Sequence, residues 1–306
     1  MPTTLRHVRL PGGLKIEYAE QGPRGGPALL LLHGITDTWR SFEPVLPWLP
    51  PDWHVISMTQ RGHGGSSAVT SYRTRDFADD AASLVATLGL LPVLVVGHSM
   101  GAVNAMRMAI DHPTAVRGVV AAGGFASFSD KPGLVDFIQD HVLTLGEQVP
   151  RELAESFQHD TVAGAVAPGL VETMVDECLR TPAATWRGAF AALLDDDFST
   201  EVHKIEVPVL LPWGDADAFS PESDQQRLQR QLPRATRAVY AGVGHALHWE
   251  LPRRFADDLI RFEQTLALPE MSRPAARWRQ HRQPGTPDVP DCAEVRSRPP
   301  IAAGRA

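Results

Sequence analysis

Short apolar runs alternate with amphipathic stretches along most of this 306-residue chain. The runs lack the regular polar positions of a strand with one exposed face, which indicates strands covered on both faces, as in a parallel sheet. A hairpin is predicted before them, over residues 8–18, because Pro11, Gly12 and Gly13 interrupt that segment. The expected strands lie at residues 28–32, 54–58, 93–96, 116–121, 207–211 and 236–240.

Between these runs, apolar residues recur at helical spacing. One set predicts a helix that begins after Thr74 as its N-cap, and a second set predicts a helix near residue 260. Strand, helix and strand in this order imply right-handed crossovers and an α/β fold with a doubly wound, mostly parallel sheet. The two sets are Phe77, Ala81, Leu84, Val85 and Leu88, and Phe255, Leu259, Phe262 and Leu266.

The alternation stops between residues 127 and 201, where helical patterns are separated by prolines and no strand pattern is found. A helical insertion between two strands is typical of a cap over the carboxyl edge of the sheet, where open α/β folds bind ligands. A passive surface subdomain is the alternative. We therefore expect a first core part (1–126), a helical cap (127–201), a second core part (202–270) and a tail (271–306).

The tail differs in composition from the rest of the chain. It holds six prolines and seven arginines, which is typical of a disordered segment. The whole chain has a net charge of −7, and the tail, with seven arginines against two Asp and one Glu, carries +4, so residues 1–270 carry −11. Binding to nucleic acid needs clustered Lys and Arg, and we expect no such partner for this acidic body.

The cysteines, the absence of cofactor motifs and the absence of targeting signals narrow the class of protein further. Cys178 and Cys292 lie far apart, which predicts neither a disulfide nor a zinc site. The chain has neither an H-E-x-x-H nor a G-x-G-x-x-G motif, so we expect no metal and no cofactor. The N-terminal residues lack the apolar core of a signal peptide, and no run reaches the length of a membrane span. These observations favour a cytoplasmic monomer or homodimer without a membrane partner.

The most informative motif is Gly-His-Ser-Met-Gly at residues 97–101, between the apolar run 93–96 and an apolar helical stretch. A serine two positions from a glycine on each side, at a strand-to-helix junction, predicts a nucleophile elbow, a turn so sharp that it holds the hydroxyl out of the sheet. An ordinary Gly-Ser connection is the alternative. The hydroxyl of Ser99 is a poor nucleophile by itself and requires a nearby base.

Together with four other segments, this motif resembles the α/β-hydrolase superfamily, in its capped branch of esterases, lactonases and carbon-carbon bond hydrolases. The resemblance spans roughly residues 8–268. The chain departs from the family pattern at Thr59-Gln60, where the family often has an Asp before R-G-x-G. The other segments are His33-Gly34, residues 60–66 (Gln-Arg-Gly-His-Gly-Gly-Ser), residues 214–217 (Gly-Asp-Ala-Asp) and Gly244-His245.

The resemblance implies a triad in which Ser99 is the nucleophile, His245 the base and Asp217 the acid that orients the base. Asp215, in the same loop as Asp217, is the rival acid. His248 is the rival base, and we expect it instead to pack near a helix or to contact solvent. A serine at position 99 argues against the relatives that use an aspartate nucleophile, the epoxide hydrolases and dehalogenases.

The tetrahedral intermediate of such a reaction carries an oxyanion that backbone N–H groups must meet. The N–H of Met100, at a helix N-terminus, is one candidate, and the N–H of Ile35, after His33-Gly34, is the other. We expect His33 to orient this loop, and His63 and Arg61 to have structural roles.

Aromatic residues predict an apolar pocket. Phe125 and Trp186 are the expected substrate contacts, with Met100 as a further one. An apolar pocket favours an uncharged small-molecule ester or lactone, so the predicted function is a serine hydrolase that acts through an acyl-enzyme. A carbon-carbon bond hydrolase or a perhydrolase with the same triad is one alternative, and a slow-turnover small-molecule receptor is another.

Overall fold

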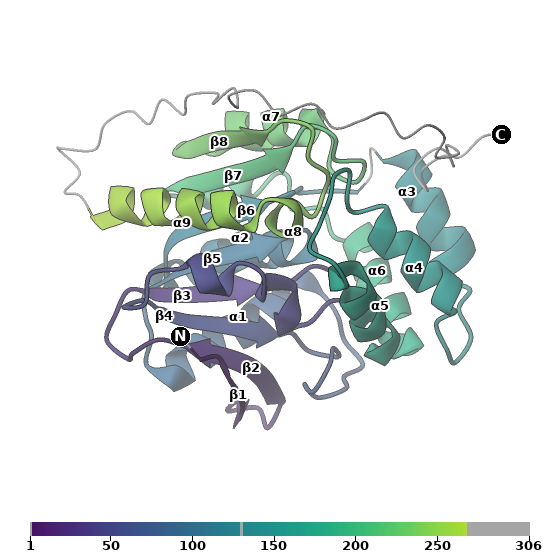
Figure 1. Ribbon diagram of the computed structural model, residues 1–306, viewed down its shortest axis with the longest axis horizontal. Helices are drawn as coiled ribbons and strands as arrows, with labels where there is room; N and C mark the ends of the chain where they lie inside the picture. The colour runs from purple at the N-terminus through teal and green to yellow at the C-terminus, as the bar shows by residue number, and fades with distance from the viewer. Residues whose placement is uncertain (1, 129–130, 268–306) are drawn as a thin grey trace.

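The computed structural model describes residues 2–128 and 131–267 and is built on one eight-stranded sheet (Figure 1). The strand order is β1-β2-β4-β3-β5-β6-β7-β8. β2 pairs antiparallel with β1 and β4, and the remaining neighbours are parallel, which confirms the expected sheet. The strands are β1 (Thr4–Arg9), β2 (Lys15–Gln21), β3 (Ala28–Leu32), β4 (His54–Thr59), β5 (Val93–His98), β6 (Val116–Ala122), β7 (Val209–Gly214) and β8 (Ala235–Tyr240).

Helices cover both faces of the sheet, which explains the apolar runs. Leu30 and Leu32 of β3 pack into a core cluster with helices α1 and α2, whereas Leu29 and Leu31 pack into a second cluster with helix α9. None of these four leucines is more than 1% exposed. Both sides of such a strand must therefore be apolar. The helices around the sheet are α1 (Thr74–Leu88), α2 (Met100–Asp111), α7 (Glu222–Gln231), α8 (Leu247–Glu250) and α9 (Pro252–Ala267).

The start of α1 differs by one residue from the prediction. The N-cap is Arg73, whose backbone N–H donates to the Asp76 carboxylate at 3.2 Å. Thr74 is the first helical residue, and its hydroxyl donates to Asp196 instead of capping the helix. The prediction of Thr74 as the N-cap is therefore wrong, because the helix already includes Thr74 and its hydroxyl bonds the insertion instead.

β7 extends beyond the predicted segment 207–211 and includes Pro212. A proline lacks the N–H that a ladder requires and usually argues against a central strand. Here β7 pairs with β6 only at Val209 and Leu210, whereas its pairing with β8 continues to Gly214. Pro212 thus lies where the strand has a full ladder on one side only.

The described residues between β6 and β7 form helices and turns without any strand. In Figure 1 these helices gather at one end of the sheet. Hydrogen bonds join them to the loops after β3 and β4: Thr38 donates to Glu177 at 2.9 Å, and Thr185 donates to the Gly62 carbonyl at 3.0 Å. The helices of the insertion are α3 (Pro132–Phe137), a π-helical turn (Ile138–Val142), α4 (Arg151–His159), α5 (Leu170–Arg180) and α6 (Ala183–Asp195).

The predicted tail (271–306) and Cys292 lie outside the described residues, so the structure does not test what the sequence predicts for them. Among the helices that the structure does describe, none combines the length and the apolar character needed to cross a membrane.

Candidate active site

Ser99 occupies a strained turn between β5 and α2. Its backbone has φ 53° and ψ −119°, a conformation that is rare for any residue other than glycine. The flanking glycines are sterically required: a Cβ on Gly97 would lie 2.0 Å from the carbonyl oxygen of Gly101, and a Cβ on Gly101 would lie 2.0 Å from that of Leu32. The motif thus forms the sharp turn that its glycines predict.

His245 and Asp217 lie together after β8 and β7. His245 Nδ1 is 2.8 Å from Asp217 Oδ2, and both residues are buried. The other carboxylate oxygen of Asp217 accepts the backbone N–H groups of Phe219 (2.8 Å) and Ser220 (2.9 Å). Because a carboxylate only accepts, His245 Nδ1 carries the proton in this pair, which leaves Nε2 as an acceptor.

Asp215, the rival carboxylate, has a different partner. Its Oδ1 accepts the backbone N–H of Gly242 at 2.6 Å, and the residue is exposed. This hydrogen bond closes the turn between β8 and the loop of His245. The contact with the imidazole therefore belongs to Asp217.

Glu250 links the loop that carries His245 to the insertion by hydrogen bonds. Glu250 of α8 accepts the backbone N–H of Gly244 at 2.8 Å and also those of Ala163 (3.1 Å) and Gly164 (2.7 Å). The position of the imidazole is thus tied to the segment that follows α4.

His248 is buried in the core and does not contact solvent. Its ring lies 4.4 Å from that of His98 and 5.0 Å from that of Phe42, and its Nε2 is 3.1 Å from Ser41 Oγ. Burial lowers the pKa of His248 to about 3, so the ring is neutral. Of the two expected roles, packing agrees with the structure and solvent contact does not.

The loop after β3 is held by two buried histidines. His33 donates from Nδ1 to the carbonyl of the next residue at 2.7 Å and accepts the backbone N–H of Gln60 at Nε2, at 2.9 Å. The side chain of Gln60 returns a hydrogen bond to the His33 carbonyl at 2.8 Å. The backbone N–H of Thr36, at φ 70°, donates to His63 Nε2 at 3.3 Å. These contacts fix the loop beside Ile35, and they involve Gln60, the position where the chain departs from the family pattern.

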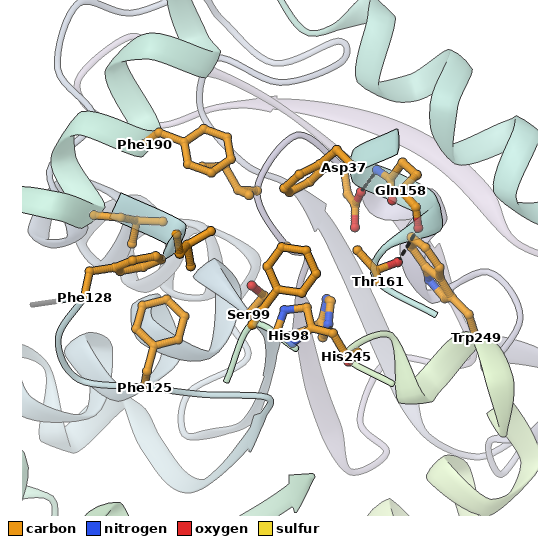
Figure 2. A pocket seen from close by; sticks show the side chains of 16 residues that line it. Asp37, His98, Ser99, Phe125, Phe128, Gln158, Thr161, Phe190, His245 and Trp249 are labelled. Carbon is orange, nitrogen blue, oxygen red and sulfur yellow. Dashed lines mark hydrogen bonds between the residues drawn. The ribbon is translucent and has the colours of Figure 1, made fainter. Parts of the chain in front are cut away.

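A cavity lies between this loop, Ser99 and the insertion (Figure 2). Ser99, His245 and Ile35 are among the residues that line it, and most of the others are apolar, Phe125 among them. Met100 is not among the described residues that line the cavity. The remaining lining residues are Gly34, Asp37, His98, Phe128, Leu134, Phe157, Gln158, Thr161, Phe190, Leu193, Phe219 and Trp249.

Trp186 lies one layer behind the cavity wall. It is fully buried, and its ring packs 5.7 Å from that of Phe157 and 5.9 Å from that of Phe190, both of which do line the cavity. Its indole N–H points to the Cys178 carbonyl at 3.4 Å. The large aromatic of α6 that reaches the cavity is thus Phe190, one helical turn after Trp186.

Asp37 and Gln158 are cavity residues that sequence reasoning missed. Asp37 lies three residues after Gly34, so its closeness to the loop after β3 was a signal available in the sequence. Gln158 is on α4, more than 100 residues away, and no local pattern marks it. Their contact, a hydrogen bond of 3.0 Å, arises only from tertiary packing.

The described residues offer no group of three or more His, Cys, Asp or Glu side chains arranged to hold a metal ion. Cys178 is a buried free thiol within 2.9 Å of Thr36 Oγ1. Burial raises its pKa, which keeps the thiol protonated and unreactive.

Comparison with known proteins agrees with this fold. Residues 27–252 match the family model described as alpha/beta hydrolase fold. A thermophilic esterase from Thermogutta terrifontis superposes with a TM-score of 0.76 at 21% identity, over 87% of this chain and all of that one.

Two curated relatives carry named activities. The chain is 27% identical over 229 residues to a pimeloyl-[acyl-carrier protein] methyl ester esterase of Neisseria meningitidis, covering 71% of this chain and 84% of the esterase. It is 40% identical over 111 residues to the 2-(acetamidomethylene)succinate hydrolase of Mesorhizobium japonicum, covering 36% of this chain and only 39% of that enzyme. With the family model matched over most of the described residues, the chain belongs to the α/β-hydrolase fold family.

Proposed function

We propose that this protein is a serine hydrolase that cleaves a carboxylic ester or lactone through an acyl-enzyme. The observation that carries the proposal is the joint presence, at one cavity, of a serine on a strained elbow and an imidazole paired with a buried carboxylate. Strain of this kind persists only where the surrounding structure over-determines it, and it is concentrated at functional sites.

In the proposed reaction, Ser99 Oγ attacks the carbonyl carbon while His245 Nε2 takes its proton. Asp217 holds the imidazole in the required tautomer and stabilises the imidazolium that forms. The imidazolium then gives the proton to the leaving alkoxide. Water attacks the acyl-enzyme by the same route, with His245 again as the base.

The oxyanion of each tetrahedral intermediate would be met by two backbone N–H groups. Met100 is the first residue of α2, and the first N–H groups of a helix have no partner within the helix. Ile35 lies in the loop that His33 and His63 fix. We assign the N–H groups of Met100 and Ile35 to the oxyanion hole.

The cavity supports an uncharged substrate. Phe125, Phe157 and Phe190 belong to its apolar wall, and no lysine or arginine is found among the described residues that line it. A dicarboxylate such as the succinate in the name of the Mesorhizobium relative would therefore lack a countercharge there. A neutral ester, as in the name of the Neisseria relative, suits this wall better.

We assign residues 127–201 to a cap over the site and Phe125 to direct substrate contact. Phe157 and Phe190 come from the cap and line the cavity, which supports the assignment of substrate choice to this segment. Trp186 is assigned a supporting role behind these two rings.

A screen of nitrophenyl esters and lactones of graded size, with the wild-type protein and Ser99→Ala side by side, tests the proposal. We expect multiple turnovers by the wild type and a decrease on the order of 10⁴-fold or more in the variant. Consumption of one equivalent of ligand would favour the receptor alternative. Products of carbon-carbon cleavage or of peracid formation would favour the relatives that share the triad.

A further inference from the structure

One side of the cavity is polar although most of its wall is apolar. Asp37, Gln158 and His98 line it, and they are 3%, 1% and 2% exposed. Figure 2 shows Gln158 hydrogen-bonded to Asp37 on the side opposite Phe125 and Phe128. Buried polar groups are normally retained for a partner, so the hydrogen bonds of these three residues need to be accounted for atom by atom.

The Asp37 carboxyl group is oriented by two donors. Ser41 Oγ donates to Oδ2 at 2.8 Å, and Gln158 Nε2 donates to Oδ1 at 3.0 Å. The single proton of Ser41 is used in this bond, so the 3.1 Å contact between Ser41 Oγ and His248 Nε2 is a bond donated by the histidine. Asp37 is therefore fixed in place. Above pH 7, where the carboxyl group is ionised despite its pKa of about 7, each of its oxygens keeps a further lone pair for another donor.

Two further acceptors have no partner. Gln158 Oε1 and His98 Nδ1 are buried without any hydrogen bond. His98 Nε2 lies 3.1 Å from the His245 carbonyl, which only accepts, so Nε2 carries the proton and Nδ1 is a bare acceptor. Burial holds the pKa of His98 well below its usual value, so the ring stays neutral. Both residues line the cavity, and the protein itself supplies neither atom with a donor.

Two of the acceptors lie close together beside Gly34. A Cβ added at Gly34 would lie 3.0 Å from His98 Nδ1 and 3.4 Å from Asp37 Oδ2, so even a methyl group would crowd both side chains. Glycine therefore allows the loop after β3 to approach both of them. Gly34, His98 and Asp37 all line the cavity that Ser99 lines.

We propose that Asp37, Gln158 and His98 form a subsite that recognises a hydrogen-bond donor, a hydroxyl or an amide N–H, on the substrate. The inference rests on the proposed ester or lactone hydrolysis and adds a substrate class to it: esters and lactones with an uncharged donor group away from the reacting carbonyl. Above pH 7, where Asp37 is ionised despite its pKa of about 7, a substrate carboxylate is rejected there because it would place acceptors against acceptors. A site built to bond a hydroxyl discriminates strongly against an analogue that lacks it.

Matched pairs of p-nitrophenyl esters test this subsite. Each pair has acyl chains of equal length that end in a hydroxyl or in a methyl group, and a third series ends in a carboxylate. For at least one chain length we expect the wild type to show a kcat/KM about tenfold or more higher for the hydroxyl ester than for its methyl partner. The carboxylate ester of that length should be the poorest substrate. Equal kcat/KM values for the hydroxyl and methyl partners at all lengths would show that these residues do not recognise a donor, and would overturn the subsite.

Variants of Gln158 and Asp37 test whether these residues cause the preference for hydroxyl esters. Gln158→Leu should lower the ratio of hydroxyl to methyl kcat/KM about tenfold, and Asp37→Asn should lower it as well because an amide N–H then faces the donor. Gln229→Leu, an exposed position on α7, is the matched control and should leave the ratio unchanged. An unchanged ratio in folded Gln158→Leu and Asp37→Asn would contradict the assignment. If neither variant folds, the wild-type pairs alone decide the outcome.

A binding measurement separates this inference from the proposed function. Calorimetry with Ser99→Ala and the methyl esters of the same acyl chains reports recognition without turnover. A hydroxyl preference in binding, with no ester turned over by the wild type, would contradict the hydrolase proposal and keep the subsite. Turnover without any preference would keep the hydrolase and remove the subsite.

Discussion

The interior of the sheet has regular backbone and apolar side chains, whereas the cavity at its edge has strained backbone and buried polar groups. In β3 and β5 the backbone ladders are regular and the leucines and valines are buried on both faces. The cavity region instead contains Thr36 and Ser99, the two non-glycine residues with positive φ among those the structure describes. It also holds the buried carboxyl group of Asp37 and two buried acceptors without partners.

The two regions differ because the sequence serves stability in the sheet and chemistry around the cavity. In the sheet, local preference and tertiary packing agree, which is what makes a fold specific. Around the cavity, local preference is overridden, and the strain is held by the neighbouring structure. Substitutions in the sheet should therefore lower the free energy of unfolding, and substitutions in the cavity should lower turnover.

The largest expected effect is on turnover, at Asp217. Asp217→Asn removes the carboxylate that orients His245 and should lower kcat on the order of 10⁴-fold. Asp215→Asn, which affects only the turn at Gly242, is the matched control and should change kcat much less. Steady-state kinetics on one ester compare the two, and the reverse ranking would refute the assignment of the acid.

Substitutions in the sheet should lower stability more than turnover. Leu31→Ala leaves a cavity in a site with no exposed surface and should lower the free energy of unfolding by about 2–5 kcal/mol. Leu5→Ala, at a position that is 50% exposed on β1, should change it by no more than about 0.5 kcal/mol. Urea unfolding measures both. The account fails here if folded Leu31→Ala loses turnover and keeps its stability.

Asp37 should make stability depend on pH. Burial raises its pKa from 3.8 to about 7, an effect that the Glu177 carboxylate supports and that His245 and the hydrogen bonds of Gln158 and Ser41 oppose. The folded protein thus holds this proton more firmly than the unfolded chain. The stability contributed by the group is greatest below about pH 4 and declines, by at most about 4 kcal/mol, as the pH rises to about 7.

Asp37→Asn removes that titration. The stability difference between variant and wild type, measured by urea unfolding at several pH values, should shift in favour of the variant as the pH rises from about 4 to about 7. A difference that stays constant across this range would mean that Asp37 is ionised throughout.

The smallest expected effect concerns Trp186. Trp186→Phe leaves space behind Phe157 and Phe190, so their rings should relax away from the cavity and admit bulkier acyl groups. We expect the ratio of kcat/KM for bulky and small esters to change less than about tenfold. An unchanged ranking with lower stability alone would show that Trp186 acts only as core.

Most strands of the sheet and the turn at Ser99 could be predicted from the sequence, because each depends on a local pattern of residues. The run 28–32 and the glycines around Ser99 carry their information within a few residues. Gln158 and Trp186 could not be placed, since the face of a cap helix that meets the cavity depends on packing against distant segments. The end of β7 at Gly214 was not predicted, because its pairing with β8 beyond Leu211 is a tertiary property.

The central claim is that the strained serine is an activated nucleophile. A fluorophosphonate probe reacts covalently with such a serine, and peptide mass spectrometry locates the label. The account predicts a label on Ser99 alone in the wild type and none in Ser99→Ala. A label on another residue, or none in folded wild-type protein, would contradict it.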